Sequence, residues 1–160
     1  MTNWSGKRVM REHVATIPAP PERVFPLLCP VREAEWVPDW QFRLIYSRSG
    51  VAEEGCVFTT PNDAGPDSTW VVTDYQPPRR IDFVWIEPGQ VAARLRFELE
   101  LAGGKTNLHA RYQYTALSEA GDAEVERFTE SWFRHKMEHF VAALNHYLET
   151  GRIMAGKAWE

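Results

Sequence analysis

The chain has few of the features that mark a disulfide-bonded, membrane-bound or nucleic-acid-binding protein. Its only two cysteines, Cys29 and Cys56, are too few for a disulfide framework and lack metal-ligand spacing, so we expect buried thiols. No run of 18 apolar residues occurs, so we expect no membrane span. The net charge of −4 argues against a nucleic-acid partner or an anionic membrane.

Signals for catalysis, metal binding and export are also missing. There is no Ser/His/Asp or Cys/His arrangement, and the only Gly-Gly pair, Gly103-Gly104, opens a hairpin instead of a phosphate-binding loop. His135 and His139 have i, i+4 spacing, but no other metal ligand accompanies them, so we expect no metal and no cofactor. The segment Met1–His13 lacks the apolar core of a signal peptide, which predicts a cytoplasmic protein.

What the sequence has in abundance is aromatic side chains, at 12% with seven tryptophans. Aromatic side chains supply large apolar surfaces with few rotatable bonds, so the interior is either a bulky core or a lined cavity. The length of 160 residues and the hydrophobic content of 44% predict a single domain over residues 1–160, with its core at 9–148.

The stretch Asp122–Thr150 predicts one long terminal helix, because it contains no proline or glycine and its apolar residues recur at helical spacing. Asp122 is the expected N-cap, and the helix would run about 40 Å. Its apolar side carries several aromatics. A face of that length must pack on a sheet instead of meeting water.

The residues before this helix predict the sheet. A strand at Arg8–Ile17 is followed by two proline-bounded short helices, one in Glu22–Cys29 and one at Val31–Val37. Six segments with alternating apolar and polar residues follow, separated by turn signals. The order predicts an α+β fold, in which about seven antiparallel strands curve around the terminal helix.

The last hairpin allows a register to be predicted. If Gly103-Gly104 form a two-residue turn, Leu99 faces Leu108 on an apolar surface. Arg96 then faces Arg111 on the other, charged surface. A slip of one residue would mix the two surfaces, so this register should be strongly specified.

Four local strings carry a resemblance that spans nearly the whole chain. They are IPAPPERVFPLLCP at Ile17–Pro30, EWVPDW at Glu35–Trp40, GVAEEGCVF at Gly50–Phe58 and DYQPPRRIDFVW at Asp74–Trp85. With the element order, they resemble the helix-grip superfamily of START and birch-pollen-allergen-like domains (SRPBCC). The chain is most similar to its polyketide cyclase/dehydrase-like branch. The resemblance implies a cavity between sheet and terminal helix that usually holds an apolar ligand.

Aromatic side chains on the inward sides of the predicted elements are the candidate ligand contacts. They lie on strands and on the first half of the terminal helix: Phe58, Trp70, Phe83, Trp85, Phe97, Tyr112, Tyr114, Phe128, Trp132 and Phe133. The functional interpretation is that these aromatic side chains line a pocket for a flat or apolar molecule. A solid core is the alternative interpretation, and it would also explain each of these residues singly.

Lys136 completes the candidate set, because it falls inside the apolar arc of the terminal helix between Trp132 and Phe140. Its ammonium could pair with a ligand carboxylate or with an acidic residue of the sheet. Alternatively, its stem could lie on apolar surface while the ammonium reaches water.

Three functions fit these observations, because this fold class hosts binders, enzymes and chaperone cofactors. The leading hypothesis is the binding of a small hydrophobic ligand, aromatic or lipid-like, by a monomer or homodimer. The second is a polyketide cyclase, aromatase or dehydratase, with Tyr112 and Tyr114 as candidate catalytic phenols; Asp82 and Arg94 point away in the expected register. The third is a protein-interaction module related to chaperone activators, which predicts a filled interior and an exposed apolar patch.

Overall fold

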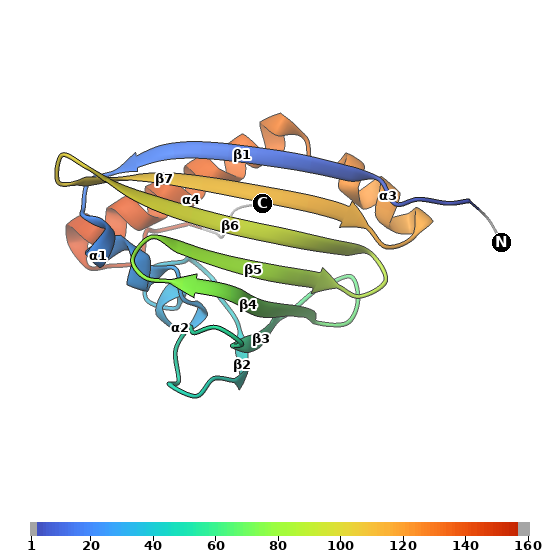
Figure 1. Ribbon diagram of the computed structural model, residues 1–160, viewed down its shortest axis with the longest axis horizontal. Helices are drawn as coiled ribbons and strands as arrows, with labels where there is room; N and C mark the ends of the chain where they lie inside the picture. The colour runs from blue at the N-terminus through green and yellow to red at the C-terminus, as the bar shows by residue number, and fades with distance from the viewer. Residues whose placement is uncertain (1–2, 157–160) are drawn as a thin grey trace.

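One antiparallel sheet of seven strands, in the order β1-β7-β6-β5-β4-β3-β2, dominates the computed structural model, which describes residues 3–156 (Figure 1). The strands are β1 (Arg8–Ile17), β2 (Arg43–Tyr46), β3 (Val57–Thr60), β4 (Ser68–Gln76), β5 (Arg80–Glu87), β6 (Val91–Ala102) and β7 (Lys105–Ala116). The helices are α1 (Pro21–Val24), the 3-10 turn η1 (Phe25–Leu27), α2 (Pro30–Glu33), α3 (Glu119–Glu126) and α4 (Glu130–Thr150). The predicted α+β helix-grip fold is confirmed.

The register of the β6–β7 hairpin is confirmed residue by residue. Leu99 pairs with Leu108 on the inner face, and Arg96 pairs with Arg111 on the outer face. Gly103 and Gly104 have φ values of 59° and 79°, which suit the two central positions of a tight hairpin turn. The alternation of buried and accessible residues along β7, and along β6 as far as Leu99, therefore follows from the sequence.

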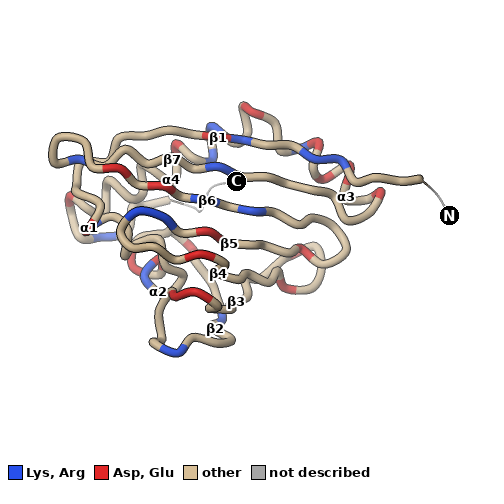
Figure 2. The backbone as a smooth tube through the Cα atoms, in the orientation of Figure 1, with Lys and Arg blue, Asp and Glu red and all other residues tan. Residues whose placement is uncertain are grey.

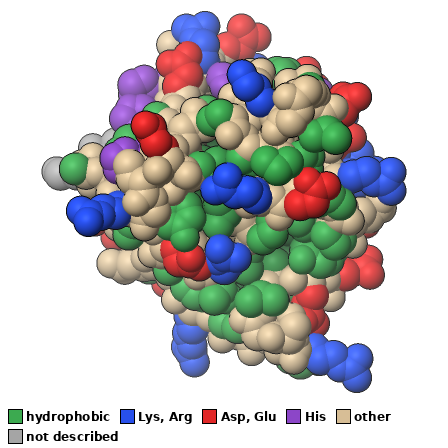
Figure 3. All heavy atoms as spheres, turned by 90° about the vertical axis from the view of Figure 1, so that its left-hand side faces the viewer, with side chains coloured by type: hydrophobic (Ala, Val, Ile, Leu, Met, Phe, Trp, Pro, Cys, Tyr) green, Lys and Arg blue, Asp and Glu red, His purple; other side chains and the backbone are tan. Residues whose placement is uncertain are grey.

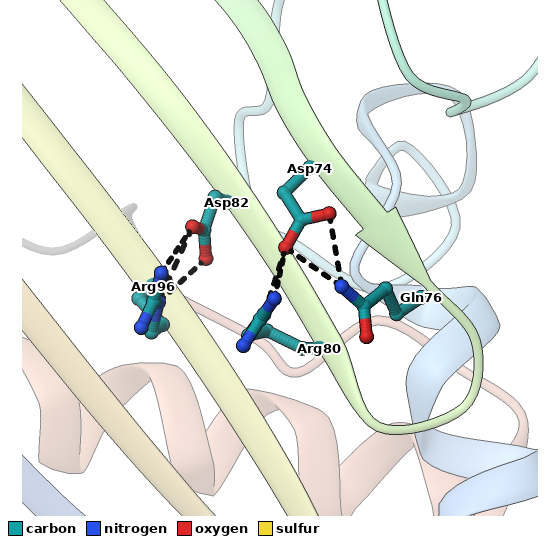
Figure 4. Close-up of polar contacts among 5 residues, drawn as sticks. All are labelled: Asp74, Gln76, Arg80, Asp82 and Arg96. Carbon is teal, nitrogen blue, oxygen red and sulfur yellow. Dashed lines mark hydrogen bonds and ion pairs between the residues drawn. The ribbon is translucent and has the colours of Figure 1, made fainter.

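The outer face of the sheet is held by cross-strand ion pairs. Figure 2 shows acidic and basic positions on neighbouring strands of the sheet. Arg96 and Arg111 are paired residues of like charge, and each is also paired with an acidic residue on its other side. Asp82 contacts Arg96 at 2.8 Å, and Glu12 contacts Arg111 at 2.8 Å. Figure 4 shows the Asp82–Arg96 pair beside a second one between Asp74 and Arg80, to which Gln76 adds hydrogen bonds. These acids stabilise pairing on the face turned away from α4.

The predicted single helix Asp122–Thr150 is wrong, because the chain breaks into α3 and α4. Thr129 lies between them in an extended conformation, with φ −71° and ψ 163°, and its hydroxyl accepts a hydrogen bond from the backbone N–H of Trp132 at 3.1 Å. This N-cap begins a new helix. α4 therefore spans 21 residues, or about 32 Å, instead of about 40 Å. It ends as expected at Gly151, which has φ 70°.

The expected N-cap at Asp122 is also wrong, because Ser118 caps α3. The Ser118 hydroxyl accepts a hydrogen bond from the backbone N–H of Gly121 at 3.0 Å. Gly121 lets α3 lie close to the β5–β6 turn, since a Cβ at this position would stand 2.0 Å from the carbonyl oxygen of Gln90. Asp122 instead fastens the N-terminal segment by accepting hydrogen bonds from the backbone of Lys7 and the indole of Trp4.

The second short helix is shorter than the predicted Val31–Val37. α2 ends at Glu33, and the chain continues in tight turns, with the backbone N–H of Trp36 donating to the carbonyl of Glu33 at 3.1 Å. Trp36 is fully buried and lies edge-on to Phe140 of α4, with ring centroids 5.1 Å apart. The side chains of α1, η1 and α2 thus close one end of the fold, where Figure 3 shows apolar groups among scattered charges.

Removal of the Thr129 cap tests this account of the helix break. We expect Thr129→Ala to lower the free energy of unfolding by ~1 kcal/mol, because the side-chain acceptor for the first turn of α4 is lost. Thr129→Ser is the matched control and should retain most of the stability. Urea unfolding measures both variants, and equal stability of Thr129→Ala and the parent chain would contradict the cap.

Candidate functional site

A cavity of about 340 Å³ lies between the inner face of the sheet and the helices α3 and α4. Its volume falls within the range of small-molecule pockets. Two rows of the sheet build its floor, because the register places Trp70, Trp85, Ala93 and Tyr114 side by side on four strands. The adjacent inward row includes Tyr112. The cavity therefore depends on strand pairing, which fixes the direction of each side chain.

Seven of the predicted ligand contacts line this cavity. Six are aromatic and one is basic: Trp70, Trp85, Tyr112, Tyr114, Phe128, Trp132 and Lys136. Their rings form a chain of contacts, in which the centroids of Tyr114 and Phe128 are 4.3 Å apart and those of Phe128 and Trp132 are 4.8 Å apart. Such edge and offset contacts hold flat side chains in fixed positions. The wall is therefore a rigid aromatic surface.

The remaining four predicted contacts lie behind the wall instead of lining it. Phe58 stacks on Trp70 at 5.4 Å, and Phe83 meets Trp70 edge-on at 6.1 Å. Phe133 packs against Tyr112 at 4.9 Å, and Phe97 packs against Tyr112 at 5.9 Å. All four are buried. They support the lining residues, and sequence periodicity cannot separate these two layers because both point inward.

Lys136 directs its ammonium into the cavity from α4. Its Nζ lies 5.5 Å from the ring centroid of Tyr112 and 5.2 Å from that of Trp132. Within residues 3–156 it forms no ion pair with a carboxylate, and burial lowers its pKa to about 8. The alternative of pairing with an acid of the sheet is not observed. Attraction to the two rings offsets only part of the desolvation of the charge.

The two candidate phenols stand side by side, with ring centroids 5.9 Å apart. Tyr114 is 2% exposed, and its hydroxyl has no hydrogen-bond partner among the described residues. Burial raises the pKa of both phenols, and the charge of Glu33 on α2 raises that of Tyr112 further. Both phenols are therefore neutral near pH 7 and can donate hydrogen bonds. An unmade bond at Tyr114 costs about 1–3 kcal/mol, which a bound ligand could recover.

Glu33 is an interior titratable group that sequence reasoning missed. It ends α2, and burial raises the pKa of its carboxyl to about 8. A negative charge on this carboxyl also raises the pKa of the Tyr112 phenol. The sequence offers little signal for it, because a glutamate in a short proline-bounded helix is usually solvated.

The end of the cavity next to α3 carries two carboxylates that sequence reasoning also missed. Glu87 ends β5 and accepts a hydrogen bond from the side-chain amide of Asn62 at 3.2 Å. Glu124 comes from α3 and pairs with Arg127 at 3.3 Å, with the Arg127 side chain 78% exposed. Both carboxylates line the cavity. The signal for Glu87 was its spacing of two residues from Trp85, which puts both on the inner face.

The two cysteines and the histidine pair of α4 are not among the residues that line the cavity. Cys29 and Cys56 are free, buried thiols, as predicted. The rings of His135 and His139 lie 4.7 Å apart on α4, but no group of three or more potential metal ligands occurs among residues 3–156. No helix in this range is long and apolar enough to cross a membrane. Asp82 lies on the outer face and serves the ion pair with Arg96.

A curved antiparallel sheet that grips a C-terminal helix, with short helices after the first strand, defines the helix-grip fold. Residues 9–149 match the family model described as polyketide cyclase / dehydrase and lipid transport, so the chain belongs to this family. A search of curated proteins found no match.

Solved structures share the fold at low sequence identity. DynU16, from the dynemicin biosynthetic locus, is 22% identical with a TM-score of 0.60; the match covers 89% of this chain and 48% of DynU16, so the chain spans about half of that protein. Ara h 8.0201 is 14% identical with a TM-score of 0.63, over 90% of this chain and 99% of that one. Norcoclaurine synthase from Thalictrum flavum, in complex with dopamine and hydroxybenzaldehyde, is 10% identical with a TM-score of 0.64, over 91% and 88% of the two chains.

The pH dependence of stability tests the interior position of Lys136. A pKa lowered to about 8 from an ordinary value near 10.5 means that the unfolded chain binds more protons between these limits. The free-energy cost of burying the charged ammonium is therefore fully present below pH 8 and disappears as the pH rises through 10.5. We expect Lys136→Met to be more stable than the parent by on the order of 1–3 kcal/mol at pH 7, with a smaller difference at pH 10.

Urea unfolding of both proteins at the two pH values measures this difference. Lys105→Met, at the exposed first residue of β7, is the matched control and should show no such change with pH. If the free energies of unfolding of Lys136→Met and the parent differ by the same amount at pH 7 and pH 10, the ammonium lies in water and the prediction is contradicted.

Proposed function

We propose that this protein binds a small, largely apolar molecule with an aromatic ring, and that Lys136 pairs with an acidic group of that molecule. Membership of the family supports the coarser conclusion, a hydrophobic-ligand-binding or cyclase-type role. The observation that carries the finer proposal is the ammonium of Lys136, which lines an aromatic cavity without a carboxylate partner among residues 3–156.

The physical chemistry of the cavity favours this ligand. Flat rings can lie against Trp70, Trp85 and Trp132, because these surfaces are already held apart by the sheet and by α4. An anionic group would restore the charge balance of Lys136 in a site with little water, where a charge-assisted hydrogen bond is strong. The complex of norcoclaurine synthase holds two small aromatic molecules, which supports this choice of size and shape.

Affinity for a matched acid and ester tests the proposal. We expect indole-3-propionate to bind more tightly than its methyl ester, and Lys136→Met to weaken binding of the acid by at least about tenfold, because a buried charge-assisted contact is lost. The ester should bind both proteins equally. Isothermal titration calorimetry measures all four affinities, with Lys105→Met as the control. An acid-to-ester ratio that is unchanged by Lys136→Met would contradict the pairing.

A second candidate function, cyclisation or dehydration of a poly-keto substrate, is favoured by the phenol of Tyr114. Its O–H is neutral, buried and without a partner within residues 3–156, so it is free to donate to a developing enolate oxygen. Tyr112 could donate beside it. The third hypothesis, an interaction module with a filled interior, receives no support because the interior holds a cavity of about 340 Å³.

Removal of each hydroxyl tests the enzymatic function. Tyr114→Phe deletes a group without a described partner, so the melting temperature should stay the same or rise slightly. If the protein is a cyclase, the same change should lower turnover of a poly-β-keto thioester by about 100-fold, the size expected for one lost donor. Tyr112→Phe is the companion variant. Full turnover in both variants would remove the phenols from the mechanism.

A further inference from the structure

We propose that the ligand also carries a cationic group, an organic ammonium, which Glu87 and Glu124 hold at the α3 end of the cavity. This inference rests on the proposed function, because it concerns the same cavity and adds a second charged group to the same ligand. The ligand would then be an aromatic molecule with an acid at one end and an amine at the other.

The strand register separates the two charged ends. Glu87 pairs with Val91 at the end of β5, whereas Tyr112, below the ammonium of Lys136, pairs with Leu95. Val91 and Leu95 are four residue steps apart along β6, which corresponds to about 13 Å. The aromatic row of Trp85 and Tyr114 lies between them. A ligand that fills the cavity therefore meets carboxylates at one end and an ammonium at the other.

Among residues 3–156, neither Glu87 nor Glu124 forms an ion pair with a cation that lines the cavity. Glu87 accepts one hydrogen bond from the neutral amide of Asn62, and within residues 3–156 it has no ion pair. Glu124 pairs with Arg127, which lies on the solvent side with its side chain 78% exposed. The negative charge of Glu124 also acts on Glu87 and, after burial, raises its pKa. One positive group between them would relieve this repulsion and pair with both.

A second feature points independently to a polar ligand at this end. Tyr114 lines the same cavity, is 2% exposed, and its hydroxyl is unpaired among the described residues. The ring centroids of Trp85 and Tyr114 are 6.5 Å apart, and an indole in the cavity wall can also stabilise an ammonium. The phenol oxygen can accept the hydrogen bond that an ammonium donates, whichever way its own proton points.

A metal ion is a poorer occupant than an ammonium. The described residues contain no group of three or more His, Cys, Asp or Glu side chains suited to a metal, and Glu87 and Glu124 are the only two carboxylates among the residues that line the cavity, whereas hard cations favour several oxygen ligands. An ammonium requires only two or three acceptors together with an apolar surface for its attached carbon chain. The chemistry of this end therefore selects an organic amine.

Two probes that differ only in the amine test the inference. The first is 4-(aminomethyl)phenylacetate, and the second, 4-methylphenylacetate, has the same ring and acid without the amine. At pH 7 we expect the amine-bearing probe to bind the parent chain about tenfold more tightly, which corresponds to one charge-assisted contact. Calorimetry measures both affinities, and a melting curve of each variant verifies that it is folded.

The variants separate this inference from the proposed function. Glu87→Gln should bring the affinities of the two probes to within about twofold, and Glu124→Gln should lower the same ratio. Glu126→Gln is the control, because Glu126 lies on α3 but pairs with Lys7 outside the cavity, so the ratio should stay at the parent value. Equal binding of the probes by the parent chain, or an unaltered ratio in folded Glu87→Gln, would overturn the cationic subsite. If the cationic subsite is overturned but Lys136→Met still weakens binding of the acid, the proposed function remains supported without the subsite. If neither probe binds the parent chain, both the subsite and the proposed function are contradicted.

Discussion

The constraint on which the site depends is the desolvation of polar groups inside an aromatic cavity. The Lys136 ammonium, the Tyr114 hydroxyl and the Glu87 carboxylate all line the cavity and are at least partly removed from water, and the described residues leave each of them with incomplete pairing. A buried polar group without its partners costs free energy in the unliganded protein. The sheet and α4 hold the surrounding rings in place, so these polar groups cannot rearrange to find partners within the protein. A ligand that supplies the missing partners would therefore gain this free energy on binding.

Strand pairing fixes the positions of these polar groups relative to one another. The outer ladder of Asp82, Arg96, Arg111 and Glu12 balances charge across four strands, and the same register sets the order of inner side chains from Glu87 to Tyr112. A slip of one residue would exchange the two faces and remove the cavity. The outer ion pairs and the inner binding groups are therefore two consequences of one alignment, although they share no contact.

Much of this arrangement could be predicted from the sequence, because period-two patterns and the Gly103-Gly104 turn determine the hairpin register. Helical periodicity likewise put Lys136 between aromatic neighbours, where the structure finds it. The helix break at Thr129 could not be predicted in this way. A threonine inside a helical pattern acts as a cap only when tertiary packing turns the chain there.

The division of the aromatics into lining and supporting layers was also beyond sequence reasoning. Phe83 and Trp85 follow the same alternation on β5, yet Trp85 lines the cavity and Phe83 lies behind it. The difference depends on the curvature of the sheet and on the distance of α3 and α4 from each row, which are tertiary properties. The same reason hid Glu124, because its place in the cavity wall depends on how α3 packs against the sheet.

The most direct test of the account is the ionisation of Lys136 itself, observed by NMR of its side-chain nitrogen in the free and the ligand-bound protein. The account predicts a pKa near 8 in the free protein, in line with burial and the lack of a carboxylate partner. Saturation with indole-3-propionate should raise this pKa, because the bound carboxylate stabilises the charged form, while the methyl ester should not. The central claim is that this ammonium lies unpaired in the cavity and binds an anionic ligand. A pKa of Lys136 that has the ordinary value of lysine in the free protein and does not change with the acid would contradict it.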